Sequence, residues 1–235
     1  MQEHIKIFMN EQILHLLNTK VKNAKNATDT TFAAFSLIKH MLMEYERELK
    51  HIMLLNDPRI KVKYTDRGTF EAELKVADDV LIFIMHTNAF AFDATHPLSK
   101  SNYVSLNPDR AVCGMISVYN FMADAMKFER RGEVGQLLGR IFINSENHFF
   151  VEGKKQIGIL FNNFNSDTIS NDTLKKLIDQ FLINALDTDA IVPPIDAMRE
   201  ITVHDALTYM IETSMYDGKK VGFKFRNQQD DDVTA

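Results

Sequence analysis

The chain has 235 residues, of which 45% are hydrophobic and 25% charged, a composition typical of a globular protein and not of a disordered or fibrous one. Its formal net charge of −5 lends no support to a nucleic-acid partner. No apolar stretch approaches the roughly 20 residues that a membrane-spanning helix needs, so we expect no membrane partner.

The cysteine content and the start of the chain bear on the compartment. Cys113 is the single cysteine, which excludes an intramolecular disulfide framework and a zinc site built from several cysteines. The first residues, MQEHIKIFMNEQ, carry acidic and amide side chains where a signal peptide would need a basic end and an apolar core. The sequence therefore predicts a cytoplasmic protein.

Residues 1–57 are predicted to be helical and to form a hairpin of two helices. Asp29, Thr30 and Thr31 are good N-cap residues, so we expect the second helix to begin there. This helix carries apolar residues at alternating spacings of three and four, which fits either packing inside the same domain or self-association as a homodimer. The residues of the stripe are Phe35, Ile38, Leu42, Tyr45, Leu49 and Ile52.

Residues 58–165 read as a sheet, because Asp57-Pro58 ends the helix and the apolar period changes to two. Residues 59–64 and 69–76 alternate around a turn at residues 66–68, which predicts a hairpin. Residues 79–92 are apolar on both faces and predict a central strand, and residues 93–110 predict a loop. The remaining predicted strands span residues 112–121, 137–144, 148–152 and 156–164.

Residues 166–227 return to a helical period and end in a last predicted strand at residues 221–225. The first of these helices has a full amphipathic stripe from Leu174 to Leu186, with Ser170 or Asn171 as its N-cap. A second helix is expected over residues 202–215, and the tail 228–235 is expected to be disordered. The fold class is therefore α+β, with a mainly antiparallel sheet of about six to eight strands in one domain over residues 1–227.

Several catalytic motifs are absent from the sequence. It contains no GxxxxGK[ST], GxGxxG, HExxH, GxSxG or CxxC pattern. Kinase, dinucleotide-binding, zinc-protease and α/β-hydrolase readings therefore have no support.

One hairpin suggests a metal-dependent reaction. Glu73-Leu74-Lys75 has the E-x-K form of the PD-(D/E)xK nucleases, which this stretch resembles, and Asp66 precedes it. The resemblance implies that Asp66 and Glu73 hold Mg²⁺ and that Lys75 polarises a phosphate. Asp66 follows a threonine in place of the family's proline, and alternation alone explains Glu73 and Lys75 as a solvated strand face.

A second set of polar residues suggests a pocket. His86 and Asn88 interrupt the apolar run of residues 79–92, and Asn120 and His148 lie in or beside later predicted strands. If those strands pair with the central one, the four side chains could converge on a small molecule or peptide, or His86 and His148 could join His96 at a metal. They could equally be hydrogen-bonded structural residues.

Two classes of function follow from these residues. The first is a non-catalytic interaction module, homodimeric, with a ligand pocket near His86, Asn88, Asn120 and His148. The second is a phosphodiesterase or nuclease that uses Asp66, Glu73 and Lys75. The sequence identifies no cofactor and predicts no metal site for the first class, and Mg²⁺ is implied only for the second.

Overall fold

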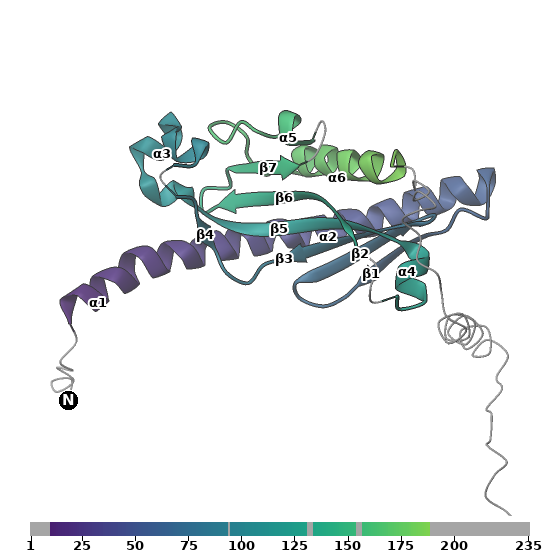
Figure 1. Cartoon of the computed structure of the whole chain (residues 1–235), viewed down its shortest axis with the longest axis horizontal. Helices are drawn as coiled ribbons and strands as arrows, with labels where there is room; N and C mark the ends of the chain where they lie inside the picture. Colours follow the sequence, from purple (N-terminus) through teal and green to yellow (C-terminus); the bar gives the residue numbers. More distant parts are fainter. Residues whose placement is uncertain (1–9, 94, 131–133, 154–156, 189–235) are drawn as a thin grey trace, which may run out of the picture. The chain divides into compact units, whose positions relative to one another are not determined.

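The structure is a computed structural model that describes residues 10–93, 95–130, 134–153 and 157–188. It contains a seven-stranded antiparallel sheet in the order β1-β2-β3-β5-β6-β7, with β4 paired to β5 (Figure 1). This confirms the α+β class. The strands are β1 (Val62–Asp66), β2 (Glu71–Val76), β3 (Asp79–Met85), β4 (Phe90–Ala91), β5 (Val112–Met122), β6 (Gln136–Asn144) and β7 (Phe149–Gly153).

The helices lie before, between and after the strands. Residues 124–130, which hold most of α4, group apart from the body that contains the sheet. None of the helices in the described residues is long and apolar enough to cross a membrane. The helical elements are α1 (Glu11–Leu16), the π-helical turn η1 (Leu17–Val21), α2 (Lys22–Asn56), the 3-10 turns η2 (Pro97–Lys100) and η3 (Pro108–Ala111), α3 (Asn102–Leu106), α4 (Ala123–Lys127), α5 (Ile157–Leu160) and α6 (Asn171–Leu186).

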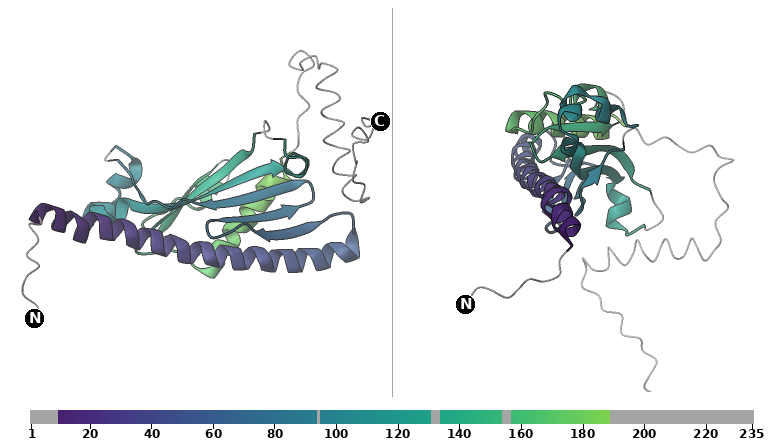
Figure 2. Two further views of the ribbon diagram at one scale, coloured as in Figure 1. Left: turned by 90° about the horizontal axis from the view of Figure 1, so that it is seen from below. Right: turned by 90° about the vertical axis from the view of Figure 1, so that its left-hand side faces the viewer.

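The predicted N-terminal hairpin is wrong, because α1, η1 and α2 run end to end as one helix (Figure 2). The threonines expected to cap a second helix lie inside it. The hydroxyls of Thr28, Thr30 and Thr31 each donate to the carbonyl four residues earlier, at 3.0, 2.9 and 2.7 Å. Threonine can form this bond within a helix, which removes its need to cap one.

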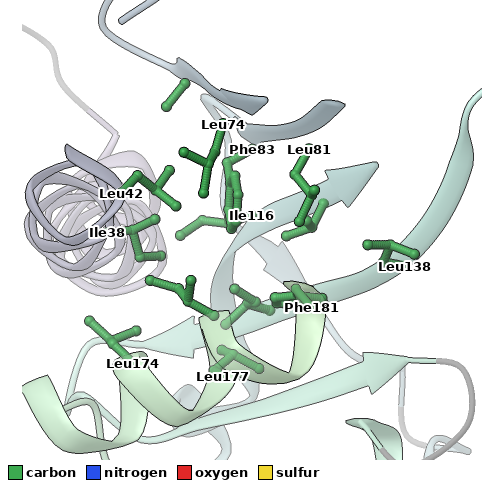
Figure 3. Packing of buried hydrophobic residues seen from close by; sticks show 14 of the residues in the cluster. Ile38, Leu42, Leu74, Leu81, Phe83, Ile116, Leu138, Leu174, Leu177 and Phe181 are labelled. Atoms are coloured by element: carbon green, nitrogen blue, oxygen red, sulfur yellow. The ribbon is translucent and has the colours of Figure 1, made fainter. Parts of the chain in front are cut away.

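The apolar stripe of α2 packs against the sheet of its own chain. Phe35, Ile38 and Leu42 are at most 1% exposed, and α6 covers the same face of the sheet (Figure 3). A hydrogen bond from the Tyr45 hydroxyl to Asp179 joins the two helices. Half of the predicted dimer seam is therefore buried in the protein's own core and is unavailable to a partner.

The predicted β1–β2 hairpin is confirmed, with Val62 opposite Val76 and Asp66 opposite Ala72. Gly68 supplies the positive φ of 114° that the turn needs. The central strand is shorter than predicted, since β3 ends at Met85.

Two segments of the middle region differ from their predictions. Residues 97–111, expected to be a loop, form three short helical turns whose caps are His96, Ser101 and Asn107. Residues 157–160, expected to be strand, form α5. The chain then returns beside β7 without becoming a strand, and the amide of Val151 donates to the carbonyl of Phe161 at 2.8 Å.

The C-terminal predictions are tested only up to residue 188. The helix with the Ser170 cap is confirmed as α6, where Ser170 and Thr173 form a reciprocal capping box. The predicted helix at residues 202–215, the strand at 221–225 and the tail at 228–235 lie outside the described residues. The prediction of one domain over residues 1–227 therefore stays a prediction.

The burial of α2 can be tested with two leucines of the same helix. Replacing the fully buried Leu42 with alanine should lower the free energy of unfolding by about 2–5 kcal/mol, because it leaves a cavity under the sheet. Leu37→Ala is the matched control, since Leu37 is 41% exposed and should cost less than about 1 kcal/mol. Urea denaturation measures both. Similar losses for the two variants would contradict this placement of α2.

Candidate functional site

His86 and Asn88 lie just beyond the end of β3, on the surface. The backbone amide of His86 still donates to the carbonyl of Met115, and its ring stacks edge-on against Phe90 with centroids 4.7 Å apart. Its Nδ1 accepts from the backbone amide of Asn88 at 3.1 Å. The two residues thus form a local turn, and the expectation that they lie inside a buried strand is wrong.

Asn120 lies near the opposite end of β5. It pairs with Leu81, whereas His86 is bonded to Met115, so about five residues, or roughly 17 Å, separate the two sites along the strand. The side-chain amide of Asn120 donates to Asp79 Oδ1 at 2.6 Å, and its Oδ1 is buried without a hydrogen-bond partner among the described residues. His86 and Asn120 therefore do not share a pocket.

His148 belongs to a polar cluster that joins η3 and α3 to the turn between β6 and β7. Its ring stacks on Tyr103 with centroids 4.2 Å apart. The Tyr103 hydroxyl donates to Glu146 Oε2 at 2.8 Å, and the Arg110 Nε contacts both Glu146 oxygens at 3.0 and 3.1 Å. The fully buried Asn144 donates to the Tyr103 oxygen at 3.0 Å.

The electrostatics of this cluster indicate a structural role. The hydrogen bonds from Arg110 hold the pKa of Glu146 below its ordinary value. Burial raises the pKa of Tyr103 to about 12, and the neighbouring Glu146 acts in the same direction against the bond from Asn144. A phenol with so high a pKa is a poor acid at neutral pH, and the carboxylate is occupied by two donors. The cluster holds residues 97–111 against the end of the sheet.

A smaller polar set lies on the sheet face opposite α2. His96 Nε2 is 3.7 Å from Glu152 Oε1, and Arg140 forms an ion pair with the same carboxylate. His96 was predicted from the sequence as a possible metal ligand, but Arg140 was not predicted as a site residue. Arg140 and Glu152 are cross-strand partners of β6 and β7, a register that cannot be read before the strand order is known.

The proposed nuclease residues are not brought together. Asp66 shares the face of Val62 and Tyr64 that turns toward α2, where Lys39 contacts it at 2.8 Å. Glu73 alternates with the buried Ala72 and Leu74, so it points to the other face, where Arg67 Nε donates to it at 2.7 Å. Two carboxylates on opposite faces of a hairpin cannot hold one metal ion.

Lys75 lies on the same face of β2 as Glu73 and on the opposite face from Asp66. It lines an open cleft of about 390 Å³ together with Arg59, Lys61 and Asp57. The carboxylate of Asp57 is occupied by Arg59, whose hydrogen bonds hold the pKa of Asp57 below its ordinary value. The cleft is polar, open and lined by surface side chains. Within the described part of the chain, Lys75 is the one predicted site residue that lines it.

The thiol and possible metal ligands add no reactive centre in the described part of the chain. Cys113 is fully buried, and burial raises the pKa of its thiol, so it is not activated as a nucleophile. Within residues 10–93, 95–130, 134–153 and 157–188, no three histidine, cysteine or acidic side chains are grouped as metal ligands.

The feature that the sequence reasoning missed is the first part of the long helix. Every residue from Asn10 to Lys22, here called the overhang, is exposed, and this end of the helix extends past the sheet (Figure 2). The body begins at Asn23, whose side chain donates to the carbonyl of Asp109 at 2.7 Å. The large apolar side chains of the overhang are Ile13, Leu14, Leu16, Leu17 and Val21, which are 50, 38, 45, 47 and 44% exposed.

A sequence signal for this surface existed. The spacing of three and four that runs from Phe35 to Ile52 passes backwards through Thr31, Thr28 and Ala24 and then meets apolar residues again at Val21, Leu17 and Leu14. What the sequence could not show was that the sheet stops covering the helix before these residues are reached.

Comparison of the chain with protein-family models, with curated proteins and with solved structures gave no match. We therefore infer the function from the residues described above.

The structural role of the polar cluster predicts a pH-dependent stability. Glu146→Gln should lower the free energy of unfolding by about 1 kcal/mol at pH 7, because it removes a charged partner of Arg110 on a partly exposed site. The folded pKa of Glu146 is depressed, so its contribution is present above the ordinary value and is lost as the pH falls through the folded value. The difference in the free energy of unfolding between variant and wild type should therefore become smaller in acid.

Thermal or urea unfolding at several pH values measures this gap. Glu48→Gln, a change on the exposed side of α2, is the matched control and should alter stability little at any pH. A gap for Glu146→Gln that is constant with pH would count against the ion pair as its cause.

Proposed function

We propose that the chain is a non-catalytic interaction module that associates with a second copy of itself through the overhang. The observation that carries the proposal is the row of five half-exposed apolar side chains on a helical segment that contacts no other element of the described structure closely enough to be buried. Scattered exposed leucines are ordinary, but five within nine residues form a continuous apolar surface.

The shape of this surface favours a second copy as the partner. Ile13, Leu17 and Val21 repeat every fourth residue and form one ridge along the helix. Within η1, which has more residues per turn than an α-helix, residues four apart such as Leu17 and Val21 lie more nearly in line with the helix axis. Two such ridges can pack against each other about a two-fold axis, and a two-fold homodimer is the commonest protein assembly.

The free energies of burial and association indicate a weak dimer. Burying the exposed half of each side chain contributes about 1 kcal/mol, hence about 10 kcal/mol for the ten side chains of two copies. Association costs at least about 4 kcal/mol in lost freedom of motion. The balance of about 6 kcal/mol corresponds to a dissociation constant of roughly tens of micromolar or weaker.

The other predictions made from the sequence have less structural support. We place the dimer interface at the overhang and not at Phe35–Ile52, because the first half of that stripe, from Phe35 to Leu42, is buried. Because His86 and Asn120 do not share a pocket, a ligand role for His86, Asn88, Asn120 or His148 stays a prediction for each residue separately. In its favour, the buried Oδ1 of Asn120 has no hydrogen-bond partner among the described residues. No observation favours the nuclease hypothesis or identifies a cofactor, and the cytoplasmic location also stays a prediction.

Leu17→Glu tests the proposal, because it places two charges at the centre of the interface without touching the core. The wild type should change from monomer to dimer between about 1 and 500 µM in sedimentation equilibrium, and the variant should stay monomeric. Leu55→Glu is the control: Leu55 is 74% exposed at the other end of the same helix, and its replacement should leave the dimer intact.

Thermal unfolding checks that Leu17→Glu leaves the fold unchanged, as expected for a residue outside the core. A wild type that stays monomeric up to 500 µM would refute self-association. A dimer that Leu17→Glu does not weaken would place the interface elsewhere.

A further inference from the structure

We infer that the two overhangs pair antiparallel, with each N-terminal end beside the lysine-rich end of the other copy. This inference rests on the proposed function, since it assigns a geometry to the same surface. It follows from the charges of the segment and from the position of the body at one end of it.

The charges of the overhang are separated along its length. Glu11 lies in the first turn, whereas Lys20 and Lys22 lie at the other end of the overhang and Lys25 follows at the start of the body. A parallel pair would bring six lysines together at one end. An antiparallel pair places each Glu11 near three lysines of the other copy, and the two helix dipoles then oppose each other favourably.

If the two-fold axis passes through Leu17, a single register pairs both the apolar side chains and the opposite charges. In this register Ile13 of one copy lies opposite Val21 of the other, and Leu17 meets its own copy on the two-fold axis. Glu11 then lies opposite Asn23, within about 4.5 Å along the axis of the levels of all three lysines, at 1.5 Å per residue.

The body of the protein also restricts the geometry. Between Ala27 and Leu42 one side of α2 is buried in the body, and Asn23 is held by Asp109 and Ser145. Parallel helices would bring both bodies to the same end of a pair whose axes are only about 8–10 Å apart. Antiparallel helices place the bodies at opposite ends, so the full length of both overhangs can pack.

Charge reversal tests the direction of pairing. We compare the wild type, E11K, K20E/K22E/K25E and the variant that carries all four changes, by sedimentation equilibrium at low ionic strength, where exposed charges are least screened. E11K and the triple variant should each dimerise about threefold to tenfold more weakly, because each places like charges opposite one another. The fourfold variant should return toward the wild-type affinity, because both partners of every contact are reversed.

A parallel pair gives a different result. Like charges would face each other in all four proteins, so the reversals would not weaken dimerisation and the fourfold variant would have no lost affinity to restore. Cysteine cross-linking provides an independent readout. I13C/V21C should form a disulfide-linked dimer under mild oxidation, whereas I13C alone should not, since its two copies lie about 12 Å apart along the axis. The native Cys113 is fully buried and does not interfere.

The outcomes separate the two proposals. A wild type that never dimerises overturns both of them. A dimer that Leu17→Glu abolishes, but whose affinity the charge reversals leave unchanged or whose I13C variant cross-links alone, overturns only the antiparallel direction. If the monomer binds phosphatidylserine vesicles and Leu17→Glu abolishes that binding, the overhang serves a lipid surface and the second copy is the wrong occupant.

Discussion

Thr31 of α2 packs directly on the backbone of β5 at Gly114, and the rest of the body depends on this close approach. A Cβ at Gly114 would lie 2.2 Å from the Thr31 hydroxyl, so no side chain can stand between helix and strand. The hydroxyl is satisfied by the carbonyl of Ala27 at 2.7 Å and approaches that of Ile143 at 3.4 Å. The helix therefore lies low on the sheet without leaving a buried polar group unpaired, and Phe35, Ile38 and Leu42 insert into the core beyond it.

The sequence predicts those elements in which local pattern and tertiary burial agree. The β1–β2 hairpin follows from strict alternation around Gly68, and α6 follows from its apolar stripe and its Ser170 cap. It fails where one residue type serves two purposes. Thr28, Thr30 and Thr31 have the chemistry of helix caps, but a helix already held against β5 uses their hydroxyls internally.

The polar cluster was harder to predict than the fold, because its main contacts, such as His148 with Tyr103 and Arg110 with Glu146, join distant segments. His148 was nominated, but its partners Tyr103 and Arg110 lie in a segment that showed no periodicity and was predicted as a loop. The extent of β3 raised the same difficulty. His86 lies within the apolar run of residues 79–92, yet the strand ends before it, and only the pairing of β3 with β5 reveals that end.

The polar clusters and the overhang differ in whether their side chains already have bonding partners. Around Glu146 and Glu152 the carboxylates are already paired with arginines, so a ligand would have to replace contacts that the fold has made. Among the residues that the structure describes, the side chains of the overhang form no such ion pair that a partner would have to replace. Its helix is an extension of α2 and avoids the unfavourable nucleation of a separate helix, which explains how it can be helical while its apolar side remains in water. Because the apolar surface is formed before a partner arrives, binding orders little additional chain, and even a short interface can then be sufficient for a reversible dimer.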